Sequence, residues 1–154
     1  MKAKDYNGTI KIYNTVPKSY GSIIGGFDLL SDSELEGHGF YDVVTPTYDP
    51  RIQELGSIQW DSANSEFTYP VNNLTWSETL SEIKENKIAL AKQQANLELK
   101  DTDWYITREA ELGTAIPSNI TTERAAIRTA CTNHETAINA KTTKAQVQSY
   151  DITY

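Results

Sequence analysis

The sequence predicts an α+β fold in which a small antiparallel β module is followed by a long helix and an antiparallel helical hairpin. Residues 1–73 contain short runs in which apolar and polar side chains alternate, separated by turn-forming residues, which is typical of strands. From residue 74 the apolar side chains recur at helical spacing instead. We therefore divide the chain into a β-rich module (1–73), a helical hairpin (74–140) and a polar tail (141–154) that we expect partner proteins to order.

Within the β module, four segments have the composition of strands and one has that of a short helix. Residues 61–64 favour a turn, so the strands on either side of it are expected to pair as a hairpin. The short helix is expected over residues 31–35, with Ser31 or Asp32 as its cap. A sheet this small needs another apolar surface packed on it. The predicted strands cover residues 10–13, 40–45, 55–60 and 66–71.

Two helices are predicted in the second half of the chain. Thr75 and Glu78 form a Thr-x-x-Glu capping box, which predicts the start of the first helix. Gly113 is typical of a helix end and Pro117 of the start of the next helix, which we expect to run to about Ala140. On the first helix an apolar residue recurs at every seventh position, so these side chains are expected to line one face. They are Trp76, Ile83, Leu90, Leu97 and Trp104.

The composition indicates a folded protein with a thin core and narrows the classes of partner. Leu, Ile, Val and Phe make up 32 of the 154 residues, close to the lower limit for a chain that buries a core, although 9 Tyr and 3 Trp add large side chains. The formal net charge of -7 and the lack of a basic stripe disfavour nucleic acids and anionic membranes as partners. We expect neither a signal peptide nor a membrane span, because no apolar run is long enough.

Few residues suggest catalysis, and we expect no cofactor and no metal. The two histidines are far apart in the sequence, and no His/Cys cluster has the spacing of a zinc site. Cys131, one helical turn before His134, is typical of a small buried side chain. The glycine-rich residues 21–26 lack the Lys-Ser/Thr pair of a phosphate-binding loop. Asp101 and Asp103, with His134, leave open a small hydrolase or metal-dependent enzyme as an alternative function.

A cluster of aromatic and arginine residues is the strongest candidate for a functional site. Trp, Tyr and Arg are the residue types enriched in the hot spots of protein interfaces. One interpretation is a partner interface at the edge of the hairpin. The other is that the two aromatic side chains hold the helices together while the arginines bridge them, and the two interpretations are compatible. The candidate interface residues are Trp104, Tyr105, Arg108, Arg124 and Arg128.

This region resembles the C-terminal part of small tailed-bacteriophage proteins, namely tail-fibre assembly and tail-associated proteins. Their pattern is an Asp-Trp pair, a nearby Arg, an Ile-Pro pair and an Arg-rich helix. Here the pattern falls on Asp103-Trp104, Arg108, Ile116-Pro117, and then Arg124 and Arg128. Upstream, residues 39–44 and the Tyr-Asp-Pro of residues 48–50 are similar to the β module that precedes this helix in such proteins. The resemblance covers roughly residues 38–130.

The resemblance implies a non-enzymatic structural or adaptor component of a bacteriophage tail, placed in the fibre, tail tip or baseplate. Such a protein is assembled in the host cytoplasm and resides in the virion. Its expected partners are other phage tail proteins and further copies of itself, as a homo-oligomer. An alternative within the same class is a transient tail-fibre assembly chaperone that is absent from the mature virion. Residues 1–37 lie outside the resemblance.

Overall fold

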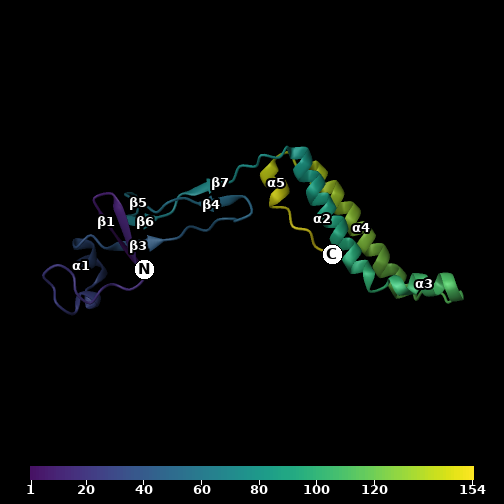
Figure 1. Cartoon of the computed structure of the whole chain (residues 1–154), viewed down its shortest axis with the longest axis horizontal. Helices are drawn as coiled ribbons and strands as arrows, with labels where there is room; N and C mark the ends of the chain where they lie inside the picture. Colours follow the sequence, from purple (N-terminus) through teal and green to yellow (C-terminus); the bar gives the residue numbers. More distant parts are fainter. The chain divides into compact units, whose positions relative to one another are not determined.

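A computed structural model describes residues 1–154, and the chain divides into two compact units. Unit 1 spans Met1–Leu74 and contains all the strands. Unit 2 spans Thr75–Tyr154 and contains the four helices that follow residue 74. The elements confirm the predicted α+β class with a long helix (Figure 1). None of the helices is both long enough and apolar enough to cross a membrane.

Unit 1 contains a five-stranded sheet and a separate two-stranded sheet. The order β2-β1-β3-β6-β5 is antiparallel except for the central pair, where β3 and β6 run parallel with Val43 opposite Phe67. The expectation of a wholly antiparallel module is therefore wrong at this pair, because β3 and β6 are joined by a long excursion rather than a turn. The strands are β1 (Lys2–Tyr6), β2 (Thr9–Tyr13), β3 (Tyr41–Val44), β5 (Gln59–Asp61) and β6 (Glu66–Thr68), with β4 (Gln53–Leu55) and β7 (Val71–Asn73) forming the second sheet.

The predicted hairpin around residues 61–64 is present, but its strands are shorter than predicted. Trp60 lies opposite Phe67, whereas Leu55 belongs to β4 and pairs with Val71 of β7. Strand β1 was not predicted, because its sequence is mostly polar. It pairs with β2 across a tight turn in which Asn7 and Gly8 both adopt positive φ, of 57° and 90°, the conformation that favours Asn-Gly in hairpins.

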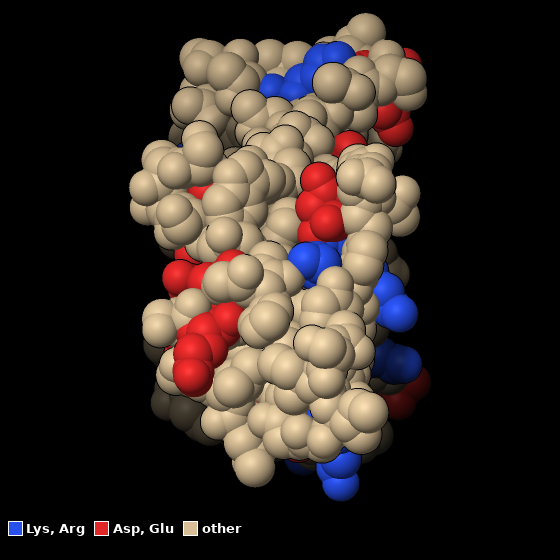
Figure 2. All heavy atoms as spheres, turned by 90° about the vertical axis from the view of Figure 1, so that its left-hand side faces the viewer, with Lys and Arg blue, Asp and Glu red and all other residues tan.

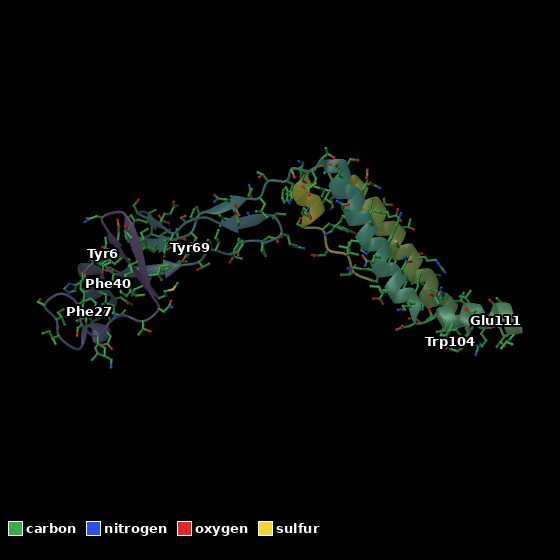
Figure 3. The ribbon with its side chains drawn as sticks, viewed as in Figure 1. Tyr6, Phe27, Phe40, Tyr69, Trp104 and Glu111 are labelled. Atoms are coloured by element: carbon green, nitrogen blue, oxygen red, sulfur yellow. The ribbon has the colours of Figure 1, made fainter.

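The core of unit 1 is aromatic and lies between the sheet, the 3₁₀ turn η1 (Phe27–Leu29) and helix α1 (Asp32–Gly37). Phe27 and Phe40 are fully buried, with ring centroids 5.2 Å apart (Figure 3). Leu35 completes this cluster. Ser31 and Glu34 form the capping box of α1, which confirms the predicted short helix.

A buried lysine links β1 to α1 and β3. The Lys2 ammonium group lies 2.7 Å from a carboxylate oxygen of Asp32 and 3.1 Å from one of Asp42, while its own side chain is only 8% exposed. Burial by itself lowers the pKa of Lys2, but the two carboxylates outweigh it and raise the pKa above its ordinary value. The same contact lowers the pKa of Asp32. Strand β1 has few apolar side chains, and these ion pairs add to its backbone pairing by joining it to α1 and β3.

Unit 2 is a helical hairpin with an added arm. Helices α2 (Leu80–Lys100) and α4 (Ser118–Ala140) lie side by side and antiparallel, α3 (Asp103–Leu112) extends beyond them, and α5 (Lys144–Gln148) packs near the start of α2 (Figure 1). The predicted end of the first helical stretch at Gly113 and the predicted second helix are both confirmed. Ile83, Ile138 and Val147 form the core of this unit.

The predicted start of the first helix is wrong by one helical turn. The capping box is formed by Thr79 and Glu82, whose backbone N–H and side-chain groups bond reciprocally, rather than by Thr75 and Glu78. Both pairs have the spacing Thr-x-x-Glu, so the sequence pattern alone does not distinguish them. Trp76 consequently lies before the helix and packs against its first turns from outside.

The predicted seven-residue apolar stripe does not form a continuous buried seam. Ile83 is 4% exposed, but Leu90 is 42% and Leu97 60% exposed. A straight α-helix drifts relative to a strict seven-residue repeat, so the stripe rotates away from α4 along its length. The hairpin instead closes over the small residues Ala91 and Ala95, which are buried.

The tail, residues 141–154, contains α5 and packs on its own hairpin, while its ordering by partner proteins stays a prediction. Val147 of α5 is fully buried. The His134 ring lies 2.8 Å from both the Tyr150 hydroxyl and the Thr153 carbonyl oxygen. Because a carbonyl only accepts, Nε2 of His134 donates to Thr153, and in the neutral ring Nδ1 then accepts from Tyr150. The Tyr154 hydroxyl donates to the carbonyl of Ala91 at 2.6 Å.

The position of the α2 cap can be tested by substitution. We expect Thr79→Ala to lower the free energy of unfolding of unit 2 by about 1 kcal/mol, because it removes the side-chain acceptor for an unpaired N–H group of the first turn. Thr75→Ala should change it by less than about 0.5 kcal/mol. Urea unfolding followed by helical circular dichroism measures both variants. Equal effects, or a larger effect at Thr75, would place the helix start where the sequence pattern first predicts it.

The pair between Lys2 and Asp32 should make part of the stability of unit 1 depend on pH. Since the folded-state pKa of Asp32 is lowered, its contribution is complete above about pH 4 and is lost as the pH falls through the lowered value. Asp32→Asn should therefore lower the urea midpoint at neutral pH, and this effect should shrink as the pH is lowered below about 4. In a Lys2→Met background the same substitution should show much less of this pH dependence, and an undiminished dependence there would contradict the assignment.

Candidate interaction surface

Helix α3 is the one long element that adds nothing to a core. None of its side chains is buried, although the helix is ten residues long. It begins after a short break at Asp101 and Thr102, and it ends at Gly113, which adopts a left-handed φ of 67°. Trp104 and Glu111 lie near its two ends, beyond the paired part of α2 and α4 (Figure 3). Helix α3, which we call the α3 arm, is therefore exposed to solvent and does not pack into the core of unit 2.

Three of the predicted interface residues form one stacked cluster on α3. The rings of Trp104 and Tyr105 have centroids 3.8 Å apart at an interplanar angle of 31°. The guanidinium of Arg108 lies 4.8 Å from the Trp104 ring and 5.3 Å from the Tyr105 ring, within the range of cation–π attraction. Trp104 is still 50% exposed. The cluster is thus preorganised by its own contacts while its largest ring remains open to a partner.

Apolar and acidic residues surround this cluster. Ile106 is 42% exposed and Leu112 is 73% exposed, so α3 presents apolar surface along its length. The segment 98–123, which includes α3, holds six acidic residues against two basic ones before Arg124. Figure 2, which views the molecule from the side of unit 1 and not from α3, shows Lys and Arg side chains and Asp and Glu side chains scattered among uncharged residues, without a continuous basic patch. The acidic residues of segment 98–123 are Glu98, Asp101, Asp103, Glu109, Glu111 and Glu123.

Arg124 does not join the exposed cluster; it is 5% exposed and holds the break between α2 and α3. Its Nη1 donates to the Leu99 carbonyl at 2.9 Å and to the Thr102 hydroxyl at 2.6 Å, and its Nη2 donates to Asp103 at 2.9 Å. The Leu99 carbonyl belongs to the last turn of α2 and also accepts from the backbone N–H and the hydroxyl of Thr102. This residue therefore positions α3, as the interpretation of bridging arginines predicts.

Arg128 lies apart from the other four candidates. It is exposed on α4 and lines a shallow cavity of about 300 Å³ with residues of α2 such as Lys92 and Asn96. The free thiol of Cys131 lies in the same cavity. The structure therefore brings Trp104, Tyr105 and Arg108 together and separates both α4 arginines from them.

The residues considered for catalysis do not form a common site. Asp103 pairs with Arg124, and His134 holds the C-terminal segment through Tyr150 and Thr153. Asp101 is exposed at the end of α2. No group of three or more His, Cys, Asp or Glu side chains is placed to hold a metal ion.

Unit 1 has a concave surface that the sequence did not single out. A cavity of about 350 Å³ is lined by the aromatic rings of Tyr41, Trp60 and Phe67, with Lys4 and Asp5 at its edge. Tyr41 and Trp60 meet edge to face with centroids 4.5 Å apart, and Trp60 is 41% exposed. The lining residues come from four different strands, so only the sheet pairing brings them together.

Comparison with protein-family models, with curated proteins and with solved structures found no match to this chain.

The two arginines of α4 provide a matched test of the geometry. We expect Arg124→Met to lower the free energy of unfolding of unit 2 by about 2 kcal/mol, because it removes the charge-assisted hydrogen bonds that join α4 to Leu99, Thr102 and Asp103. Arg128→Met, four residues later and exposed, should change it by less than about 0.5 kcal/mol. Urea unfolding measures both. Equal losses would show that Arg124 is not a special support of the α2–α3 break.

Proposed function

We propose that this protein is a non-enzymatic structural or adaptor component of a bacteriophage tail, acting in the fibre, tail tip or baseplate through protein–protein contacts. The observation that carries the proposal is the α3 arm, a ten-residue helix with no buried residue that displays a Trp–Tyr–Arg stack. A helix that buries none of its own apolar side chains gains little stability from the chain that bears it. A partner protein that covers the apolar side chains of α3 would account for their exposure in the isolated chain.

The composition of the arm supports binding rather than solvation. Trp and Tyr bring large, rigid contact areas that lose little side-chain entropy when they are buried by a partner. Arg108 already stacks on both rings, and its Nε lies shielded from solvent without a hydrogen-bond partner. A buried N–H group of this kind is costly unless an acceptor is supplied. A partner carbonyl or carboxylate supplies one if its binding shifts the Arg108 side chain and uncovers this atom.

The resemblance to tail-associated phage proteins supports the class of partner. Its pattern covers the whole arm and the residues that hold it. In this chain Asp103 and Arg124 pair to fix the start of α3, while Trp104 and Arg108 are displayed. The residues that carry the resemblance therefore divide into a support and a contact surface, which is what a docking element needs.

Quantitative mass spectrometry of purified phage particles tests the role. If the chain is a tail component, particles of the phage that encodes it should contain it at a fixed copy number per tail. A transient assembly chaperone should be present in infected cells and absent from particles. Absence from a phage genome, or from both particles and tail-assembly intermediates, would contradict the proposal.

Trp104→Ala tests the α3 arm itself. We expect it to reduce the amount of this chain in particles or assembly intermediates at least tenfold, because truncation of a central hot-spot residue costs about 2 kcal/mol or more. The free energy of unfolding should change by less than about 0.5 kcal/mol, since the side chain is half exposed and outside any core. Leu90→Ala, a residue of similar exposure on α2, is the control. Unchanged incorporation with lost stability would make the cluster a packing feature instead.

A further inference from the structure

A groove beside the α2–α4 hairpin is only partly filled by the chain's own C-terminal segment. Residues 150–154 lie along the hairpin, with the Tyr150 and Tyr154 rings meeting the His134 ring edge to face at 5.7 Å and 5.2 Å. Hydrogen bonds to His134 and to the Ala91 carbonyl fix this segment. The filled part shows what the groove accepts, namely an extended segment that inserts aromatic side chains.

The remainder of the groove is open next to Tyr154. We call it the hairpin groove; its volume is about 350 Å³ and it lies against the middle of α4. The floor is apolar, with Ile127 partly exposed between two small side chains of α4, which allow a second backbone to approach closely. Two acidic side chains stand at its edge. The lining residues are Glu98, Glu123, Ala126, Ile127, Ala130 and Tyr154.

The edge of the groove is a site of unbalanced negative charge. Glu98 and Glu123 are exposed and have no ion-pair or hydrogen-bond partner, whereas other carboxylates of unit 2 are paired, as in Lys92–Glu135 and Arg124–Asp103. A ligand with a Lys or Arg beside its apolar side chains complements this edge. A two-fold pairing of copies of this chain is disfavoured, because it would bring the acidic segments 98–123 of the two copies toward each other.

We infer that the hairpin groove binds an extended segment of another protein that carries an apolar or aromatic side chain next to a Lys or Arg. The apolar side chain packs on Ile127 beside the Tyr154 ring, and the cation lies between the carboxylates of Glu98 and Glu123. This site uses no residue of α3. It is therefore independent of the proposed tail role and of the Trp104 cluster.

Nuclear magnetic resonance of the full isotope-labelled chain tests the inference with two peptide probes. Both are acetylated and amidated pentapeptides: Tyr-Lys-Ile-Thr-Tyr and its acidic counterpart, Tyr-Glu-Ile-Thr-Tyr. We expect the basic peptide to shift the amide signals of Ile127 and Ala130, with a Kd on the order of 1 mM. It should bind at least about threefold more tightly than the acidic peptide, the effect of one to two exposed ion pairs.

Two double variants locate the charge effect. Glu98→Gln with Glu123→Gln should remove the preference for the basic peptide. Glu109→Gln with Glu111→Gln changes the net charge by the same amount on α3 and should leave the preference intact. Circular dichroism verifies that both variants fold as the wild type does.

Several results would overturn the inference. Equal affinity for the two peptides would exclude a basic segment as the ligand. So would the absence of amide shifts with either peptide at concentrations several times the expected Kd. Shifts confined to His134 and residues 149–154 would mean that the probe displaces the chain's own segment and does not enter the open part. A dimer in light-scattering measurements that dissociates in the Glu98→Gln, Glu123→Gln variant would make a second copy the occupant.

Discussion

The hydrogen bonds of Arg124 are the interaction on which the shape of unit 2 depends. A buried guanidinium needs acceptors, and the two terminal nitrogens of Arg124 find them in the last turn of α2, in the break and in the first residue of α3, while its Nε has none. One of these acceptors, the Leu99 carbonyl, also accepts from the backbone N–H and the hydroxyl of Thr102, so Arg124 and the break share it. The Arg124 side chain thus contacts the end of α2, the break and the start of α3. These contacts fix the break, so that α3 forms an arm separate from the α2–α4 hairpin.

This support leaves α3 free of any role in the core. The hairpin is closed elsewhere, by Ile83 and Ile138 and by α5 folding back over them. A thin core is sufficient because the contacts between α2 and α4 use small side chains at close approach, such as Ala91 and Ala95. The large aromatic residues of the second half are then available at Trp104 and Tyr105, and at Tyr150 and Tyr154 along the groove.

Local sequence signals predicted most helices and strands well, but they predicted poorly which elements and side chains contact one another. Turn and capping residues such as Gly113 and Ser31 act within a few positions, so the second helix and the short helix were predictable. Thr75 and Thr79 offer the same local signal, and only packing selects the second. Arg124 and Arg128 share a helix face by spacing, yet one is buried and the other exposed, because the break in α2 lies opposite Arg124 alone. The parallel pairing of β3 with β6, and the groove beside α4, depend on residues distant in sequence.

The lack of burial on α3 also has a consequence for how this arm behaves in time. Segments with few buried contacts open locally at a small fraction of the global unfolding free energy, and their amides exchange with solvent accordingly. Here the first turn is held by Arg124 while the last turns have only the Gly113 cap. Local unfolding of α3 is therefore expected to start at its C-terminal turns and to stop at the first turn, which Arg124 holds. A partner that orders the arm must offset this lost freedom, so the contacts that it makes with Trp104 and its neighbours have to be strong enough to hold the distal turns in place.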